Sequence, residues 1–466
     1  MPVQRSRTTD LTNGNPYRLI ISFALPILLG QVFQNLYNSV DSIIVGNYVG
    51  KTALAAVSSC SDISMLLTGF FTGFSTGSGV LFARYFGAKK YDDLHDAIHT
   101  ALAFAFAIGI ILALTGVLLT PVLLKIVACP EDVLKEATDY LRIYLIGILF
   151  TAIYNVASGV LRAVGDSRSP LYYLIITSIA NIILDTDFVA LLKWGVIGAA
   201  AATILSQLLS CFLIFRNMLR TKDVYRFVPR DLKIRKEYLG QIIDLGIPAA
   251  IQASLISISN LFVQRYINLF GSSAMAGVGA AKKIDKFIGI ISQSIGLAAT
   301  TYASQNLGAK KTDRAMGTVR VCMLLALGSI VLLGTPVYIF APQSLRIFTS
   351  DAEAINYGVA MVRVILPLYV FQSANAIYAN VVRGFGKSRQ VMLFSVFGMI
   401  VCRQIFLGIT MSVWHDIRFV YVGFPVGWGC AAIFCIIYYY RMIARMKKEQ
   451  RTAEAAAATE SGASQG

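Results

Sequence analysis

The stretch that decides the fold runs from Pro26 to Gly46 and reads PILLGQVFQNLYNSVDSIIVG. Most of it is apolar, yet Gln31, Gln34, Asn38 and Asp41 recur at spacings of three and four residues. On an α-helix this spacing places all four side chains on one face. A charged group inside a membrane span costs about 2.5–3.5 kcal/mol, so it usually faces a cavity or a partner. The stretch predicts a membrane helix with a polar face, although Asp41 alone could equally cap the span near the headgroups.

The composition extends this prediction to the whole chain. Hydrophobic residues make up 56% of the 466 residues and charged residues only 14%, which is not the balance of a soluble globular protein. Apolar runs of about twenty residues, each long enough to cross a bilayer core, recur along the chain. We therefore predict an all-α polytopic membrane protein with twelve transmembrane helices, at about residues 17–45, 53–83, 95–124, 133–161, 169–192, 195–219, 238–268, 274–304, 315–340, 354–382, 390–413 and 418–441.

The basic residues sort by side of the membrane. The N-terminal tail, the C-terminus and every second connection carry 27 Lys and Arg residues, whereas the other connections carry five. By the positive-inside rule, both termini should lie in the cytoplasm. This topology accounts for most of the net charge of +16, and we expect no nucleic-acid partner. The seven cysteines include no CxxC pair, so we interpret them as packing residues.

The chain also repeats itself. Gly87-Ala88-Lys89-Lys90 matches Gly308-Ala309-Lys310-Lys311, and VLRAVGDSR from Val160 matches VVRGFGKSR from Val381. Six spans in each repeat give both halves the same direction through the membrane, so a parallel repeat is expected. We predict a cytoplasmic tail (1–15), a first six-helix lobe (16–219), a basic cytoplasmic inter-lobe loop (220–237), a second lobe (238–445) and a disordered cytoplasmic tail (446–466).

These residues resemble the multidrug and toxic compound extrusion (MATE) transporters. The resemblance rests on GQxxQNLYNSVDSIIVGNYVG in the first span, GAKK after the second, LRAVGDSRSP after the fourth, NIILD in the fifth and SQNLGAKK in the second half. Because residues 355–382 contain no Asp or Glu, the chain looks like the bacterial DinF-type branch. The resemblance implies two six-helix lobes around a central cavity in a bacterial plasma (inner) membrane. It also implies export of organic cations or amphipathic compounds, driven by protons or sodium.

The two repeats differ in their charges, which locates a candidate coupling site. Asp41 aligns with Val263 and Asp185 with Phe406, so only the first half carries these carboxylates. Asn181 lies one turn before Asp185 on the same predicted face. Asp185 lies about 24 Å along its predicted helix, and Asp41 lies roughly as deep or slightly shallower, so the two carboxylates could share a site. Two like charges in a low dielectric raise the pKa of one of them, which permits proton exchange.

The resemblance adds Tyr140 and Thr203 as hydroxyl partners of this cation-coupling site. For the substrate cavity we expect Gln34 and Asn38 in the first lobe. Lys282 and Asp285 in the second lobe could line the cavity or form a structural ion pair.

We thus expect a secondary antiporter that works by alternating access, not an enzyme. Its partners should be the lipid bilayer and small organic molecules, it should function as a monomer, and it should need no cofactor beyond the coupling ion. No Walker A, HExxH or GxSxG sequence occurs. His95 and His99 have a spacing that could hold a metal, but polar residues are routine at the cytoplasmic entry to a span, so no metal site is expected. The alternative is a flippase for a lipid-linked precursor, which would use Lys282 and its neighbouring lysines in a basic cavity.

Overall fold

The computed structural model describes residues 8–127 and 129–463, and throughout these residues the regular elements are helices. The first lobe holds α1 (Pro16–Tyr48), α2 (Lys51–Gly87), α3 (Tyr91–Ile126), α4 (Leu134–Ala163), α5 (Arg168–Asp185), the π-helix η1 (Thr186–Leu191) and α6 (Gly195–Arg220). The second lobe holds α7 (Lys236–Asn268), α8 (Gly271–Gly308), α9 (Thr312–Ile339), α10 (Ala341–Arg346), α11 (Ala352–Ile365), η3 (Leu366–Leu368), α12 (Tyr369–Gly384), α13 (Ser388–Val396), η4 (Phe397–Cys402), α14 (Arg403–Val413) and α15 (Ile417–Ala463).

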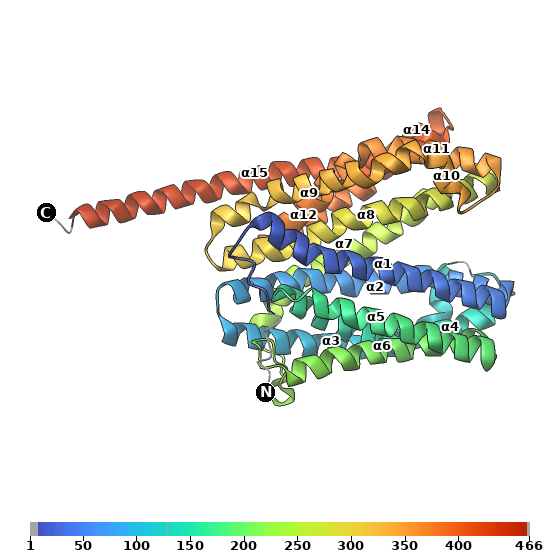
Figure 1. Ribbon diagram of the computed structural model, residues 1–466, viewed down its shortest axis with the longest axis horizontal. Coiled ribbons are helices and arrows are strands. Elements are labelled where there is room, and N and C mark those ends of the chain that lie inside the picture. The colour runs from blue at the N-terminus through green and yellow to red at the C-terminus, as the bar shows by residue number, and fades with distance from the viewer. Residues whose placement is uncertain (1–7, 128, 464–466) are drawn as a thin grey trace.

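The predicted fold class is confirmed, with two six-helix lobes seen one above the other in Figure 1. Among the described residues, eleven helical segments are long and apolar enough to cross a membrane. The twelfth spanning element is α8, whose 38 residues carry Lys282, Lys283, Asp285 and Lys286 near the middle. Two predicted spans are interrupted helices: α11 and α12 are joined by a 3₁₀ turn at Pro367, and α13 and α14 by the π-helix η4.

The first helix of each lobe begins against the opposite lobe. Ile20 and Phe23, near the start of α1, are buried in one core with residues of α8, α9 and α12. Tyr238 and Ile242, near the start of α7, are buried with residues of α2, α3 and α4. In Figure 1, α1 and α7 therefore cross, since each begins beside the opposite lobe and runs toward its own.

The lobes touch at the end of the bundle that holds the N-terminus, which we call the termini end. There α2 and α7 approach so closely that only glycine fits: a Cβ atom on Gly73 would lie 2.4 Å from the Ala249 carbonyl oxygen, and one on Gly77 would lie 2.1 Å from that of Leu245. Toward the far end, where α1 joins α2, the two lobes separate (Figure 1). The lobes therefore pack closely at the termini end, and their backbones diverge toward the far end.

Residues Thr9–Gly14, which we call the N-terminal strap, join both lobes at the termini end. The strap's first residue donates its backbone N–H to the Val164 carbonyl of the first lobe at 3.2 Å. Leu11 donates its backbone N–H to Oε1 of Gln305 on α8 at 3.0 Å. Nε2 of the same glutamine donates to the Ala163 carbonyl at 2.7 Å. Strap and glutamine thus close one hydrogen-bonded link between the lobes.

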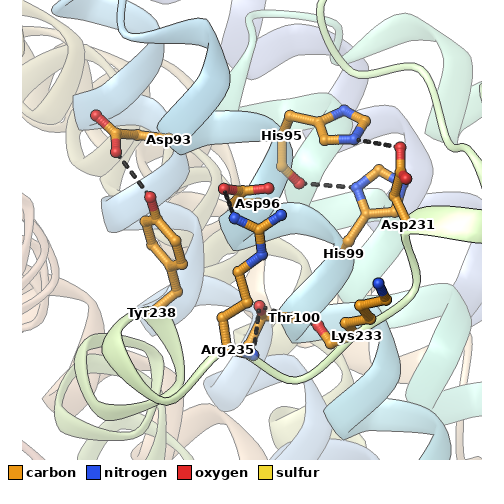
Figure 2. A network of polar contacts seen from close by, with 9 residues as sticks. All are labelled: Asp93, His95, Asp96, His99, Thr100, Asp231, Lys233, Arg235 and Tyr238. Atoms are coloured by element: carbon orange, nitrogen blue, oxygen red, sulfur yellow. Dashed lines mark hydrogen bonds and ion pairs between the residues drawn. The ribbon is translucent and has the colours of Figure 1, made fainter.

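The inter-lobe loop lies along the start of α3 instead of hanging free. The Val228 N–H donates to Nε2 of His99 at 2.9 Å, and Nδ1 of His99 donates to the His95 carbonyl at 2.7 Å. His95 Nε2 lies 3.1 Å from an Asp231 carboxylate oxygen. Figure 2 shows three further contacts: Arg235 with Asp96, Thr100 with the Lys233 carbonyl, and Tyr238 with Asp93. Both histidines therefore hold the loop.

One sequence prediction about the tails is wrong. We expected disorder over residues 446–466, but α15 continues as a helix to Ala463. The segment is rich in Ala, Lys, Arg and Glu, all strong helix formers, so helix propensity supports the extension. Residues 464–466, and residues 1–7 of the N-terminal tail, lie outside the described residues.

Candidate transport site

The candidate site lies between α1 and α5, which run side by side in the first lobe. A Cβ atom on Gly30 of α1 would lie 3.5 Å from Leu174 of α5, so the two helices pack closely. α5 ends at Asp185, and the chain continues from there as the π-helix η1. π-Helical turns inside membrane helices and other helices occur frequently at functional sites.

The structure brings Asp41 and Asp185 together, as the sequence predicts. The two carboxyl groups lie close enough to interact electrostatically. Asp185 is fully buried (0% exposed), whereas Asp41 is half-buried. Apart from this mutual interaction, both oxygens of Asp185 and Oδ1 of Asp41 lack a hydrogen-bond partner within the described chain. Asn181, one turn from Asp185, is also buried, and both polar atoms of its amide lack a partner there.

Tyrosines of α1 and α4 surround this pair. Tyr140 interacts electrostatically with Asp41, in the neighbourhood that the family resemblance implies. Tyr37 of α1 interacts with both carboxylates, and Tyr144 stacks on Tyr140 with ring centroids 6.2 Å apart. Tyr37 and Tyr144 are site residues that the sequence did not predict. The four-residue spacing of Tyr140 and Tyr144 on one helix face was the available signal.

Thr203 is the expected site residue that the described contacts do not bring to the carboxylates. Its hydroxyl donates to the Ala199 carbonyl of its own helix at 3.0 Å. A hydroxyl that bonds one turn back along its helix is satisfied locally. The described hydrogen bond of Thr203 therefore lies within α6, and the role of Thr203 at the coupling site stays a prediction.

The arrangement suits cation exchange. The two carboxyl groups and the amide present oxygen and nitrogen atoms without hydrogen-bond partners in the described part of the chain. Unpartnered atoms of this kind are rare among buried polar groups. Among the described residues, no ion pair links Asp41 or Asp185 to a Lys or Arg. A proton or a small hard cation can therefore enter without displacing a protein cation.

The four expected cavity residues fall into two groups. Gln34 and Asn38 are exposed on α1. Lys282 is half-buried and donates to Oε1 of Gln264 on α7 at 2.7 Å. Asp285 accepts a hydrogen bond from the Tyr369 hydroxyl inside the second lobe, beside a cavity of about 10 Å³. That volume holds about one water molecule, so Asp285 itself faces the lobe's interior.

Arg403, the first residue of α14, is a further buried charge that the sequence did not predict as a site residue. Only 1% of it is exposed, and its guanidinium donates to Oδ1 of Asn260 at 3.1 Å and to Oγ of Ser259 at 2.5 Å. An arginine within an otherwise apolar predicted span was a readable signal, because such residues usually mark functional sites.

The comparisons with known proteins agree with this architecture. The family model described as MatE matches residues 26–186 and 248–408, one match in each lobe. The chain is 29% identical to the probable multidrug resistance protein YoeA of Bacillus subtilis (strain 168), over 96% of this chain and 97% of that protein. It is 26% identical to the probable multidrug resistance protein NorM of Thermotoga maritima, over 81% and 82%.

Two solved structures show the same fold. One is a multidrug resistance MATE family transporter of the MOP superfamily in an outward-facing conformation, with a TM-score of 0.89 and 23% identity over 96% of this chain and 100% of that one. The other is a MOP superfamily transporter from Pyrococcus furiosus, for which a binding pocket of reverse polarity suggests a different function, with a TM-score of 0.89 and 22% identity over the same shares. With both lobes matched by its family model, this multi-pass membrane protein belongs to the MatE family, the MATE transporters.

Proposed function

We propose that the protein is a secondary antiporter that exports cationic or amphipathic organic compounds in exchange for protons or sodium ions. The printed names of its relatives, multidrug resistance proteins, support export of drug-like compounds. The close packing of the lobes at the termini end and the divergence of their backbones toward the far end support alternating access, in which the lobes open to one side of the membrane at a time.

The observation that carries this proposal is the pair Asp41 and Asp185. Two interacting carboxylates without a protein counter-ion repel each other strongly in a low dielectric, so binding one proton or cation relieves the repulsion. The same relief disappears when the cation leaves, which allows the site to alternate between a cation-loaded and a substrate-loaded state. One proton that moves through 100 mV supplies about 2.3 kcal/mol, enough to drive accumulation of substrate against a gradient.

The proposed orientation follows from the charge distribution. With the basic connections and both termini in the cytoplasm, the termini end faces the cytoplasm and the far end faces outward. The structure then corresponds to a state that is open to the outside, in which substrate would leave and the coupling cation would enter.

The test is transport in liposomes that contain only the purified protein. A fluorescent organic cation is loaded, and a pH gradient and a sodium gradient are imposed in separate experiments. We expect efflux with one gradient and its loss in the double variant Asp41→Asn with Asp185→Asn. Full gradient-driven efflux by that double variant would contradict the proposal.

A further inference from the structure

A second charged site lies in the opposite lobe. Arg403 of α14 and Lys282 of α8 flank one aromatic ring, that of Phe424 on α15. The guanidinium carbon lies 5.7 Å and the lysine Nζ 6.0 Å from the ring centroid. We call these three residues the Phe424 cluster. Three helices thus bring two cations to one ring. The hydrogen-bond partners that the neighbouring helix α7 supplies to these cations, among them Gln264, are all uncharged.

The cluster carries more positive than negative charge. Lys282 interacts electrostatically with the Asp285 carboxylate, an attraction, and with Arg403, a repulsion. Within the described residues Arg403 makes no ion pair, and its buried Nε has no hydrogen-bond partner. Buried charges are normally paired, because an isolated one loses its hydration without compensation. The two positive charges, on Arg403 and Lys282, therefore face a single carboxylate, that of Asp285, and the site lacks a second negative group among the described residues.

The cluster also occupies the position that corresponds to the acidic site of the first lobe. Asn260, which accepts from Arg403, is the repeat counterpart of Asn38 on α1. Arg403 itself corresponds to Ile182, between Asn181 and Asp185. The repeat thus places negative charge between the first and fifth spans of one lobe and positive charge between the equivalent spans of the other.

We propose that the Phe424 cluster binds an anionic group, a carboxylate or phosphate, of an amphipathic substrate. This inference rests on the proposed export function and narrows its substrate class from cations to compounds that also carry an anion. An arginine offers a planar set of donors to such groups, and a lysine adds a second charge. The Phe424 ring provides an apolar surface beside the charged group, and exposed Asn260 marks the edge from which the site can be reached.

The test compares two dyes with the same fluorophore: rhodamine B, which has a free carboxylate, and its ethyl ester, in which an ethyl group replaces that charge. Binding of each to the purified full-length protein is measured by fluorescence anisotropy in nanodiscs of neutral phosphatidylcholine. We expect the wild type to bind rhodamine B about tenfold more tightly than the ester, the effect of one charge-assisted contact. Arg403→Gln and Lys282→Gln should each reduce this preference to near unity.

Arg383→Gln is the matched control. Arg383 is a buried arginine of the same lobe that donates to Gln252 and Asn380, away from the Phe424 ring. The control should keep the preference. If Arg403→Gln does not yield folded protein, Lys282→Gln decides, since its side chain is only half-buried. Equal binding of both dyes by the wild type, or an undiminished preference in Lys282→Gln, would overturn the inference.

A further arm identifies the source of the anion. If the site takes a soluble carboxylate, anionic phosphatidylglycerol in the nanodisc should leave rhodamine B binding intact. If the site takes a lipid headgroup, the lipid should compete with rhodamine B. Both results are consistent with an anion-binding site. The ester also separates this inference from the proposed function. Gradient-driven efflux of the ester that depends on Asp41 and Asp185 would uphold the antiporter even if the dye preference were absent.

Discussion

Gln305 of α8 donates its side-chain N–H to the backbone carbonyl of Ala163 at 2.7 Å, so one buried amide joins the second lobe to the first. The other atom of the same amide holds the N-terminal strap. Any movement that opens the termini end must break the hydrogen bond to Ala163 and release the strap from one of the two lobes. This residue is therefore the natural place to weaken the closed state.

We expect Gln305→Ala to favour opening at the termini end. The change leaves the Leu11 N–H without its acceptor and removes the donor to Ala163, and each such loss costs about 1–3 kcal/mol. Hydrogen–deuterium exchange should become faster in the strap and at the end of α8. Gln404→Ala, which removes hydrogen bonds to Ser259 elsewhere in the second lobe, is the control. Unchanged exchange in the strap would show that the link does not hold the lobes.

Asp41→Asn and Asp185→Asn should each abolish gradient-driven efflux and leave substrate binding measurable. Asparagine preserves size and hydrogen bonding but cannot exchange a proton or balance a cation. Efflux from liposomes and binding to the same preparation are the two measurements. Asp187→Asn, two residues further along in η1, is the control and should transport normally. Loss of binding together with efflux in both variants would point to a structural role instead.

Gly77→Val should prevent closure at the termini end. A Cβ atom there would meet the Leu245 carbonyl oxygen at 2.1 Å, and backbone cannot yield as a side chain can. Such overpacking typically costs about 1–3 kcal/mol. The variant should lose transport and show raised exchange in α2 and α7. Gly79→Ala is the matched control, since its Cβ atom would make only an ordinary contact at 3.8 Å. Normal transport by Gly77→Val would contradict the prediction that close packing here is needed for transport.

His99→Leu should release the inter-lobe loop. The ring accepts from Val228 and donates to His95, so its removal leaves the part-buried Val228 N–H without its acceptor and takes one hydrogen bond from the His95 carbonyl. Hydrogen exchange of residues 226–235 should accelerate. Lys233→Ala removes a side chain from the same loop but keeps the carbonyl that Thr100 contacts, and it should exchange like the wild type. A loop that exchanges equally fast in all three proteins would be a simple tether, tolerant of insertions.

Single cysteines placed at Arg230 and Lys448, in a version that lacks the native cysteines, should react only with reagents that reach the cytoplasm. This expectation rests on the 27 basic residues of the predicted cytoplasmic side against five on the other. A cysteine at Trp194, between η1 and α6, is the control for the outer side. Labelling of position 230 in intact cells by an impermeant reagent would reverse the proposed orientation.

The fold was predictable because its signals are long and repeated. The GAKK pair at Gly87 and Gly308 set the repeat, and the apolar runs set the number of spans. The crossing of α1 and α7 into opposite lobes was not predictable, because Ile20 and Ile242 look like ordinary lipid-facing or core residues in the sequence. Their partners are decided by packing between distant segments.

The acidic site was predictable in part. Asp41 and Asp185 stood out because carboxylates are rare in apolar spans. Tyr37 and Tyr144 did not, since tyrosines are common in membrane helices. Only its interaction with the carboxylates distinguishes Tyr37, and only its stacking on Tyr140 distinguishes Tyr144. Arg403 was visible in the sequence but its significance was not, because it depends on Lys282, a residue of another helix, sharing the same Phe424 ring.

The exchange of helix beginnings between lobes also constrains how the molecule is made. The start of α1 and the strap find their burial partners on α8, α9 and α12, which leave the ribosome only after the entire first lobe. During synthesis this early segment must wait, uncovered, in the lipid or against the insertion machinery. The two lobes consequently cannot mature one after the other as independent products. Final assembly of the earliest segment depends on the latest half of the chain.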